Sequence, residues 1–203
     1  MKKYNDIEQR TPEWFQKRKG VITGTVLKGI MGTPYMRQEM FYELLAQRLT
    51  VGIEDEDYEN AMERGTRLEP DAIAQFEFET GKQVERIGFV EGDDPSMANS
   101  PDGYIGETEA IEAKCLGGRN HVRMWLENEI PKDYYWQVIQ YFVVNKKLEK
   151  VYFVGYNPDI PSHPLHIIEV EREKVKDDIS NAIKTQEEFI EKINFTLGEI
   201  VKL

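Results

Sequence analysis

The chain has 203 residues, of which 40% are hydrophobic and 31% are charged. These proportions are ordinary for a globular protein, and the length favours one domain over residues 1–203. No apolar run reaches the roughly 20 residues that a membrane-spanning helix needs, and the first residues lack the apolar core of a signal peptide. The single cysteine excludes an internal disulfide framework. We therefore expect a cytoplasmic protein without a membrane partner.

The net charge of −11 is unevenly distributed along the chain. Residues 1–50 carry nine Lys and Arg against five Asp and Glu, whereas residues 51–168 carry eleven against twenty-three. Phosphate binding relies on Lys and Arg, so most of the chain is unsuited to nucleic acid. The basic N-terminal quarter fits an anion-binding face, and a solvated basic helix is the alternative interpretation.

Capping signals and apolar periodicity predict seven helices. Thr11 and Pro12 suit the start of a short helix that ends at Gly20. Thr23 or Thr25 caps a second helix that runs to about Gly32. The remaining helices are predicted over residues 36–50, 60–80, 119–128, 133–145 and 173–197.

The predicted helix over residues 60–80 follows an acidic stretch at 54–59, which we expect to be a solvated loop. Its core candidates are Ile73, Phe76 and Phe78. Pro70 removes a backbone hydrogen bond from this helix. Either the helix kinks there, or a new helix begins with Glu69 near its cap.

Strand patterns separated by turn residues occupy five segments, which are residues 83–91, 97–105, 109–116, 150–156 and 165–171. The first three would form a meander. Helices, a meander, helices, two strands and a closing helix together predict an α/β fold with a central mixed sheet flanked by helices.

The segment 99–115 carries the chemistry that most needs an explanation. Asp102 lies in a Pro-Asp-Gly turn, and Glu112 and Lys114 follow in an apolar strand pattern. Strand side chains alternate, so Glu112 and Lys114 leave the same face. Burying them is costly unless they are paired or bind a metal ion. Carboxylates suit Mg²⁺ or Mn²⁺, and a nearby ammonium can act on a bound water, so phosphodiester hydrolysis fits this set best. A simple Glu112–Lys114 pair on an edge strand is the alternative.

An aspartate after proline followed by Glu-x-Lys resembles the signature of the PD-(D/E)xK nuclease superfamily. Matching segments lie in the same order at residues 14–25, 64–69, 76–81, 99–103 and 135–141. Together they resemble the lambda exonuclease and YqaJ-type phage recombinase family over residues 8–172. The resemblance implies a restriction-endonuclease-like core and a single nuclease domain over residues 1–203.

The resemblance also implies the residues of a metal-dependent active site. Two Mg²⁺ ions, which Mn²⁺ could replace, would be held by Glu69, Asp102, Glu112 and the Ala113 carbonyl group. Lys114 would act on the attacking water, and Gln137 would position the lysine or the water. An ordinary helix-cap role for Glu69 and a surface role for Gln137 are the alternatives.

Two further sets of residues would contact DNA if the resemblance holds. Arg18, Thr23 and Thr25 would bind the 5′-terminal phosphate, although the threonines could simply cap a helix. Arg119 would contact the strand. Met62 would be inserted between bases at the duplex end, with a core methionine as the alternative.

The activity implied is that of a Mg²⁺-dependent 5′-to-3′ exonuclease. It would degrade one strand of linear double-stranded DNA from a 5′-phosphorylated end and leave a 3′ overhang for single-strand annealing recombination. Its partners would be double-stranded DNA ends, two copies of itself in a homotrimeric ring, and a single-strand annealing protein, in a phage or prophage setting within a bacterial host. The alternatives are a related endonuclease or single-strand exonuclease of the superfamily, and a non-catalytic DNA-end-binding recombination component.

Overall fold

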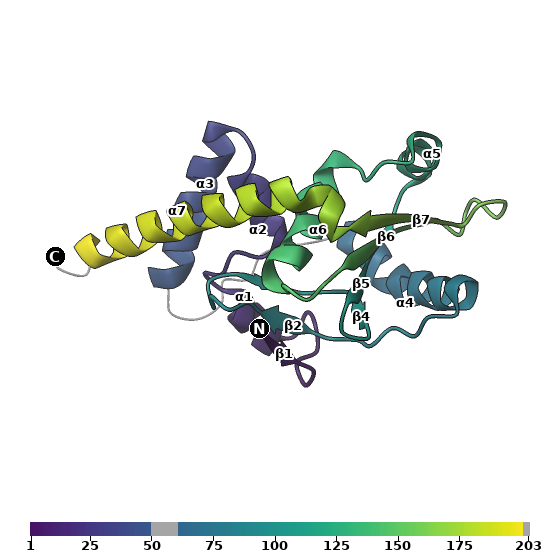
Figure 1. Cartoon of the computed structure of the whole chain (residues 1–203), viewed down its shortest axis with the longest axis horizontal. Coiled ribbons are helices and arrows are strands. Elements are labelled where there is room, and N and C mark those ends of the chain that lie inside the picture. Colours follow the sequence, from purple (N-terminus) through teal and green to yellow (C-terminus); the bar gives the residue numbers. More distant parts are fainter. Residues whose placement is uncertain (50–60, 201–203) are drawn as a thin grey trace.

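The computed structural model (Figure 1) describes residues 1–49 and 61–200 and omits the side chains of 61–66. The described part of the chain contains two β-sheets, and the smaller one lies at the edge of the molecule beside the N-terminus (Figure 1). The small sheet is antiparallel and has the order β1 (Lys2–Tyr4), β2 (Phe89–Glu91), β3 (Ala98–Asn99). The large sheet has the order β4 (Gly103–Ile105), β5 (Glu109–Cys115), β6 (Lys150–Tyr156), β7 (Leu165–Glu171). Within it β5 and β6 are parallel and the other neighbours are antiparallel. The predicted mixed sheet is therefore confirmed.

Helices cover both faces of the large sheet (Figure 1). One face is covered by α4 (Ala61–Thr80). The other face is covered by α6 (Lys132–Val144). α2 (Gly24–Ile30) and α7 (Lys176–Ile200) pack on α6, and α3 (Pro34–Leu49) packs on α2 and α7. The remaining helices are α1 (Pro12–Arg18), α5 (Gly118–Glu127) and the 3₁₀ turn η1 (Arg172–Val175). Within the part of the chain that is described, no helix is long and apolar enough to cross a membrane.

Strand β5 contributes to two separate cores because its side chains alternate. Ile111 and Ala113 pack with Phe76 of α4. Ala110 joins the larger core, to which Phe142 of α6 belongs. Fully burying one such aromatic side chain stabilises the fold by about 1.5–3 kcal/mol. The same alternation directs Glu112 toward α6.

The predicted meander over residues 83–116 is wrong as one sheet, although the neighbouring strands β2 and β3, and β4 and β5, pair in antiparallel fashion. Only 89–91 of the first segment form a strand, and this strand pairs with β1, which was not predicted. The second segment is broken between β3 and β4, which belong to different sheets. Pro101 has no N–H to donate to a ladder, so a continuous strand is disfavoured there. Asp102 lies in this break.

Most helix predictions are confirmed within one to three residues at each end. The chain continues through Pro70 as one helix, so a new helix starting at Glu69 is wrong, and Glu69 lies inside α4. Phe78 is also wrong as a core residue, because it is 85% exposed. Successive helical residues are rotated by about 100°, which places Phe78 far around the helix from the buried Phe76. The acidic stretch at 54–59 lies outside the described residues.

Candidate active site

Asp102 is held at the junction of the two sheets by hydrogen bonds to β5 and α6. Its Oδ2 atom accepts a hydrogen bond from the Ala113 N–H of β5 at 2.7 Å. Its own N–H donates to the Tyr141 hydroxyl of α6 at 3.2 Å. The next residue must be small, because a Cβ at Gly103 would lie 2.1 Å from the Val84 Cγ1 atom. The Asp102 carboxylate is therefore buried against β5 in one orientation.

Glu112 meets two side chains on the α6 face of β5. Its Oε1 atom lies 2.5 Å from the Lys114 Nζ atom, and its Oε2 atom accepts from the Tyr141 hydroxyl. The same hydroxyl lies 3.0 Å from the Ile111 carbonyl oxygen. A hydroxyl has one proton to donate, and the carboxylate is the stronger acceptor because it is charged. The predicted common face of Glu112 and Lys114 is confirmed.

Tyr141 was missed as a site residue, although it ends the segment 135–141 that resembles the family. It is fully buried, and a buried tyrosine hydroxyl usually has a hydrogen-bond partner. A tyrosine in an otherwise apolar helical stripe was the available signal. Only the packing of α6 on β5 shows that its partners are Glu112 and the Asp102 backbone.

The electrostatics of the site favour an added cation. Burial raises the pKa of Asp102 well above its usual value of 3.8, and the neighbouring Glu112 raises it further. Burial lowers the pKa of Lys114, but attraction to Glu112 and Asp102 outweighs this, so the pKa is raised overall. Burial and the two carboxylates also raise the pKa of Tyr141. Lys114 therefore remains an ammonium group, and Tyr141 remains a hydrogen-bond donor.

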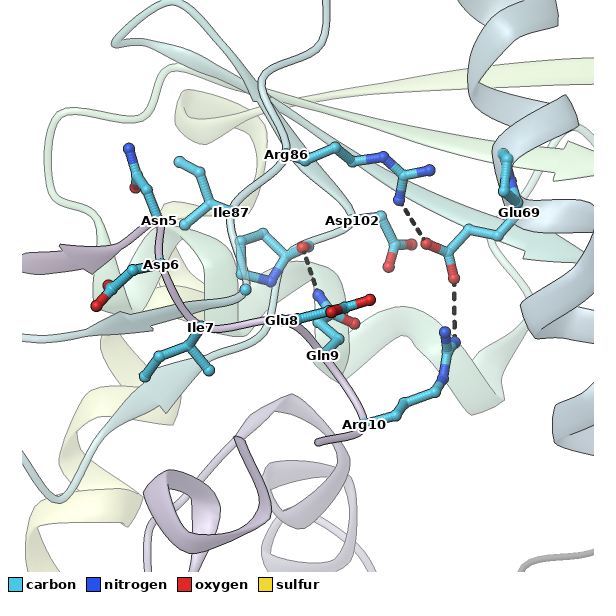
Figure 2. A pocket seen from close by; sticks show the side chains of 13 residues that line it. Asn5, Asp6, Ile7, Glu8, Gln9, Arg10, Glu69, Arg86, Ile87 and Asp102 are labelled. Atoms are coloured by element: carbon cyan, nitrogen blue, oxygen red, sulfur yellow. Dashed lines mark hydrogen bonds and ion pairs between the residues drawn. The ribbon is translucent and has the colours of Figure 1, made fainter. Parts of the chain in front are cut away.

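Glu69 reaches the site from α4 and is held by two arginines. Its Oε1 atom lies 2.7 Å from Arg86 Nη1, and its Oε2 atom lies 3.2 Å from Arg10 Nη2. Figure 2 shows the Glu69 and Asp102 carboxylates facing each other at a pocket of about 420 Å³. Glu69 is close enough to raise the pKa of Asp102. The structure thus brings Glu69, Asp102 and Glu112 into one region.

The donor set fits a divalent cation chemically. Carboxylates are the hard oxygen ligands that Mg²⁺ and Mn²⁺ prefer, and Mg²⁺ typically uses only one or two of them. Asp102 and Glu112 are both buried and repel each other, which a cation would relieve. Among residues 1–49 and 67–200, no three His, Cys, Asp or Glu side chains are grouped as ligands of one ion. Glu69 would have to leave its arginines to complete such a group.

The predicted phosphate-binding residues lie beside this region. Arg18 Nη1 donates to the Ser100 hydroxyl at 2.7 Å, and Nη2 donates to the Thr23 hydroxyl at 3.3 Å. The Trp14 ring lies 4.3 Å from the guanidinium carbon and supports it. Thr23 occupies the N-cap position of α2, but its side chain makes no capping hydrogen bond. Ser100 was missed in the sequence, although it adjoins the Pro-Asp-Gly turn.

The other predicted contacts are placed as follows. Gln137 donates to the Thr25 hydroxyl at 3.3 Å, so it contacts one of the predicted phosphate-binding residues. Its carbonyl oxygen is buried and has no hydrogen-bond partner within the described part of the chain. Arg119 is exposed on α5. The Met62 side chain lies outside the described residues.

Comparisons with known proteins show the family to which the chain belongs and the fold that it shares. The family model of the YqaJ-like viral recombinase domain matches residues 13–147. The chain is 28% identical to an alkaline exonuclease (LHK-Exo) from Laribacter hongkongensis, with a TM-score of 0.80 and coverage of 95% of this chain and 99% of that chain. The same figures hold for LHK-Exo in complex with dAMP.

A second exonuclease shows only that the fold is shared. A phage related exonuclease from Haemophilus somnus is 13% identical, with a TM-score of 0.65 and coverage of 89% of this chain and 96% of that chain. No curated protein sequence matches the chain. With a helix-flanked mixed sheet that has the PD-(D/E)xK-type fold of an alkaline exonuclease, the chain belongs to the YqaJ-like viral recombinase domain family.

Proposed function

We propose that this protein is a divalent-metal-dependent exonuclease that degrades one strand of linear double-stranded DNA from a 5′-phosphorylated end, in the 5′-to-3′ direction. The product would be a 3′ overhang for recombination by single-strand annealing. The observation that carries the proposal is the convergence of Asp102, Glu112 and Lys114 beside the Arg18 and Ser100 pair. Family membership and similarity to an alkaline exonuclease support it.

Each side chain has a distinct task in this proposal. Glu69, Asp102 and Glu112, together with the Ala113 carbonyl group, would hold one or two Mg²⁺ or Mn²⁺ ions. When bound, such ions supply positive charge at the scissile phosphate and lower the pKa of water. Lys114 is an ammonium donor that orients the attacking water, because the carboxylates raise its pKa.

The backbone also supports cleavage close to a strand end. Ser100, which contacts Arg18, and Asp102 are two residues apart, a reach of at most about 7 Å along an extended chain. Neighbouring phosphates of one nucleic-acid strand are separated by a comparable distance. A 5′-phosphate held at Arg18 would therefore place the next phosphodiester near Asp102.

The remaining elements of the proposal concern assembly and setting. We propose a homotrimeric ring around DNA, a single-strand annealing protein as partner, and a phage or prophage protein in the bacterial cytoplasm. Gln137 would position Thr25 or the attacking water. Arg119 and Met62 would contact the DNA strand and the duplex end, respectively.

Digestion of defined DNA ends tests the function. Purified protein with Mg²⁺ should degrade linear duplex with a 5′-phosphate faster than the same duplex with a 5′-hydroxyl, and should leave closed circles intact. Arg18→Ala should remove the preference for the 5′-phosphate, because it deletes a charged phosphate ligand. Lys28→Ala is the matched control, since Lys28 is half-buried on α2 and its ion pair in the described structure is with the exposed Asp133.

Each alternative function has its own outcome in this assay. Cleavage of closed circles would favour a related endonuclease, and degradation of single strands alone would favour a single-strand exonuclease. A non-catalytic DNA-end-binding component would show no Mg²⁺-dependent degradation of any substrate.

A further inference from the structure

Arg10 and Arg86 come from separate segments and converge on one carboxylate. Arg10 precedes α1, Arg86 precedes β2, and both guanidinium groups turn toward Glu69 at the pocket (Figure 2). The pair distances are 3.2 Å from Arg10 and 2.7 Å from Arg86. Two positive charges thus face one negative charge beside Asp102.

The pair has more donors than Glu69 uses. A guanidinium group carries five N–H donors in a planar fork that suits phosphate as well as carboxylate. Each arginine contacts Glu69 through a single terminal nitrogen. The Arg10 and Arg86 side chains are 38% and 49% exposed, so their other donors face the pocket or solvent.

The backbone at Arg10 indicates that its position matters. Its φ angle is +68°, in the left-handed region that residues with a Cβ rarely adopt. This conformation typically costs about 1 kcal/mol relative to glycine. Strain of this kind is concentrated at functional sites. The neighbouring Gln9 side chain donates to the Pro101 carbonyl group at 2.9 Å, which ties the segment to the loop that carries Asp102.

We propose that Arg10 and Arg86 form a binding site for a backbone phosphate of the DNA strand, next to the phosphodiester that lies at Asp102. Glu69 occupies this site as a substitute anion in the absence of DNA. When Glu69 turns toward a bound cation, both arginines are released to the phosphate. This inference rests on the proposed nuclease function and deepens it. Arg10 and Arg86 would bind the DNA strand fully only after Glu69 has turned to a bound cation.

The competing explanation is that the arginines only orient Glu69. The two explanations differ in a protein that lacks the Glu69 carboxylate. If the arginines bind phosphate directly, their removal weakens DNA binding even when there is no carboxylate to orient. The acidic Asp6 and Glu8 also line the pocket, so affinities are compared within one background.

The experiment measures binding of 5′-phosphorylated duplex DNA by fluorescence anisotropy with EDTA present, in a Glu69→Ala/Lys114→Ala protein that is not expected to cut. Adding Arg10→Gly and Arg86→Ala should weaken binding by about tenfold or more, and should lower the slope of log Kd against log salt by about two. Arg10→Gly removes the side chain and the backbone strain together, so this variant should remain folded. Lys146→Ala, an exposed site paired with Asp93, is the control for a lost surface charge.

A second comparison tests the role of Glu69. With EDTA, Lys114→Ala protein should bind DNA more weakly than Glu69→Ala/Lys114→Ala protein, because Glu69 competes for the arginines. Adding Mg²⁺ should reduce the difference in DNA affinity between the two proteins. Unchanged affinity on removing both arginines, or an equal loss from Lys146→Ala, would overturn the proposal. Failure of the nuclease proposal is seen separately, as wild-type protein that binds DNA but does not degrade it with Mg²⁺.

Discussion

At the scale of single residues, Glu112 is the point where the site is assembled. Lys114 of the same strand and Tyr141 of α6 each engage one of its oxygens. A buried carboxylate needs such partners, because removing one of them leaves a charge that is poorly solvated. The partners hold the carboxylate close enough to Asp102 for Glu112 to raise the pKa of Asp102.

Lys114→Ala tests the catalytic assignment. Turnover of linear duplex should fall by about 10²–10³-fold, the usual cost of removing one positioned hydrogen-bond donor at the reacting group, while DNA binding persists. Initial rates at saturating DNA measure this effect. Lys146→Ala, whose side chain is 73% exposed, should keep the wild-type rate. Full turnover by Lys114→Ala would show that the active site is assigned wrongly.

Tyr141→Phe tests whether the Tyr141 hydroxyl stabilises the buried Glu112 and Asp102. The change deletes a hydroxyl that donates to Glu112 and accepts from the Asp102 N–H. The free energy of unfolding should fall by about 1–3 kcal/mol, the cost of leaving buried polar groups unsatisfied. Urea unfolding measures it. Tyr35→Phe, at a side chain that is 73% exposed, should change it little; equal effects at both positions would argue against the buried network.

Asp102→Asn tests the raised pKa of Asp102 in metal-free protein. A group that binds its proton more tightly when folded stabilises the fold at acid pH, and this contribution is lost as the pH rises through the folded-state pKa. The amide variant should therefore exceed wild type in Tm at pH 8, with a difference that narrows toward pH 4. Thermal unfolding in EDTA measures it. The opposite trend would contradict the prediction, and Asp133→Asn at an exposed position is the control.

At the scale of elements, the contact between the N-terminal segment and the residue before β2 holds Arg18, the proposed phosphate ligand, in place. The Gly88 carbonyl oxygen accepts from the Trp14 indole N–H at 3.0 Å, and Trp14 in turn stacks on Arg18. A Cβ at Gly88 would lie 1.7 Å from the Ile7 carbonyl oxygen. The close approach of these two backbones therefore requires glycine.

Gly88→Ala should destabilise the protein because a backbone atom blocks the new methyl group. We expect a loss of about 1–3 kcal/mol, as for an overpacked site, together with a weaker preference for 5′-phosphate ends. Gly198→Ala in α7 is the matched control, because outside its chain neighbours and the adjoining helix backbone no atom of the described residues lies within 4 Å of the place that its methyl group would take. That variant should gain about 0.5–1 kcal/mol from helix propensity. Equal Tm values for the two variants would contradict the argument.

At the scale of the whole molecule, the fold explains why the basic residues are concentrated in the N-terminal quarter of the chain. Arg10 and Arg18 belong to the basic N-terminal quarter, and the fold brings both to the region of Asp102. The net charge of the chain remains −11, so DNA would be attracted locally and repelled elsewhere. A ring that turns these residues inward would use this asymmetry.

The proposed homotrimer is tested by solution mass. Light scattering coupled to size-exclusion chromatography should give about three times the chain mass. A monomer that still degrades duplex ends would contradict the ring while leaving the nuclease proposal intact.

Local patterns alone predicted much of this fold. Strand alternation predicted that Glu112 and Lys114 share a face, and capping signals predicted the starts of α1 and α2. Such features depend on neighbouring residues, so the sequence by itself determined them. Together with the order of helices and strands, they were sufficient to predict an α/β fold with a mixed sheet, whereas the restriction-endonuclease-like core was implied by the family resemblance.

Contacts between distant segments were decided only by the tertiary structure. The pairing of β1 with β2, the partners of Tyr141 and the position of Ser100 were not predicted. Arg10 and Glu69 are 59 residues apart in the chain, and no local periodicity relates them. The packing of α4 and the N-terminal segment around Asp102 brings them together. The sequence by itself thus determined which residues carry charge on which element, and the tertiary structure decided which charges meet.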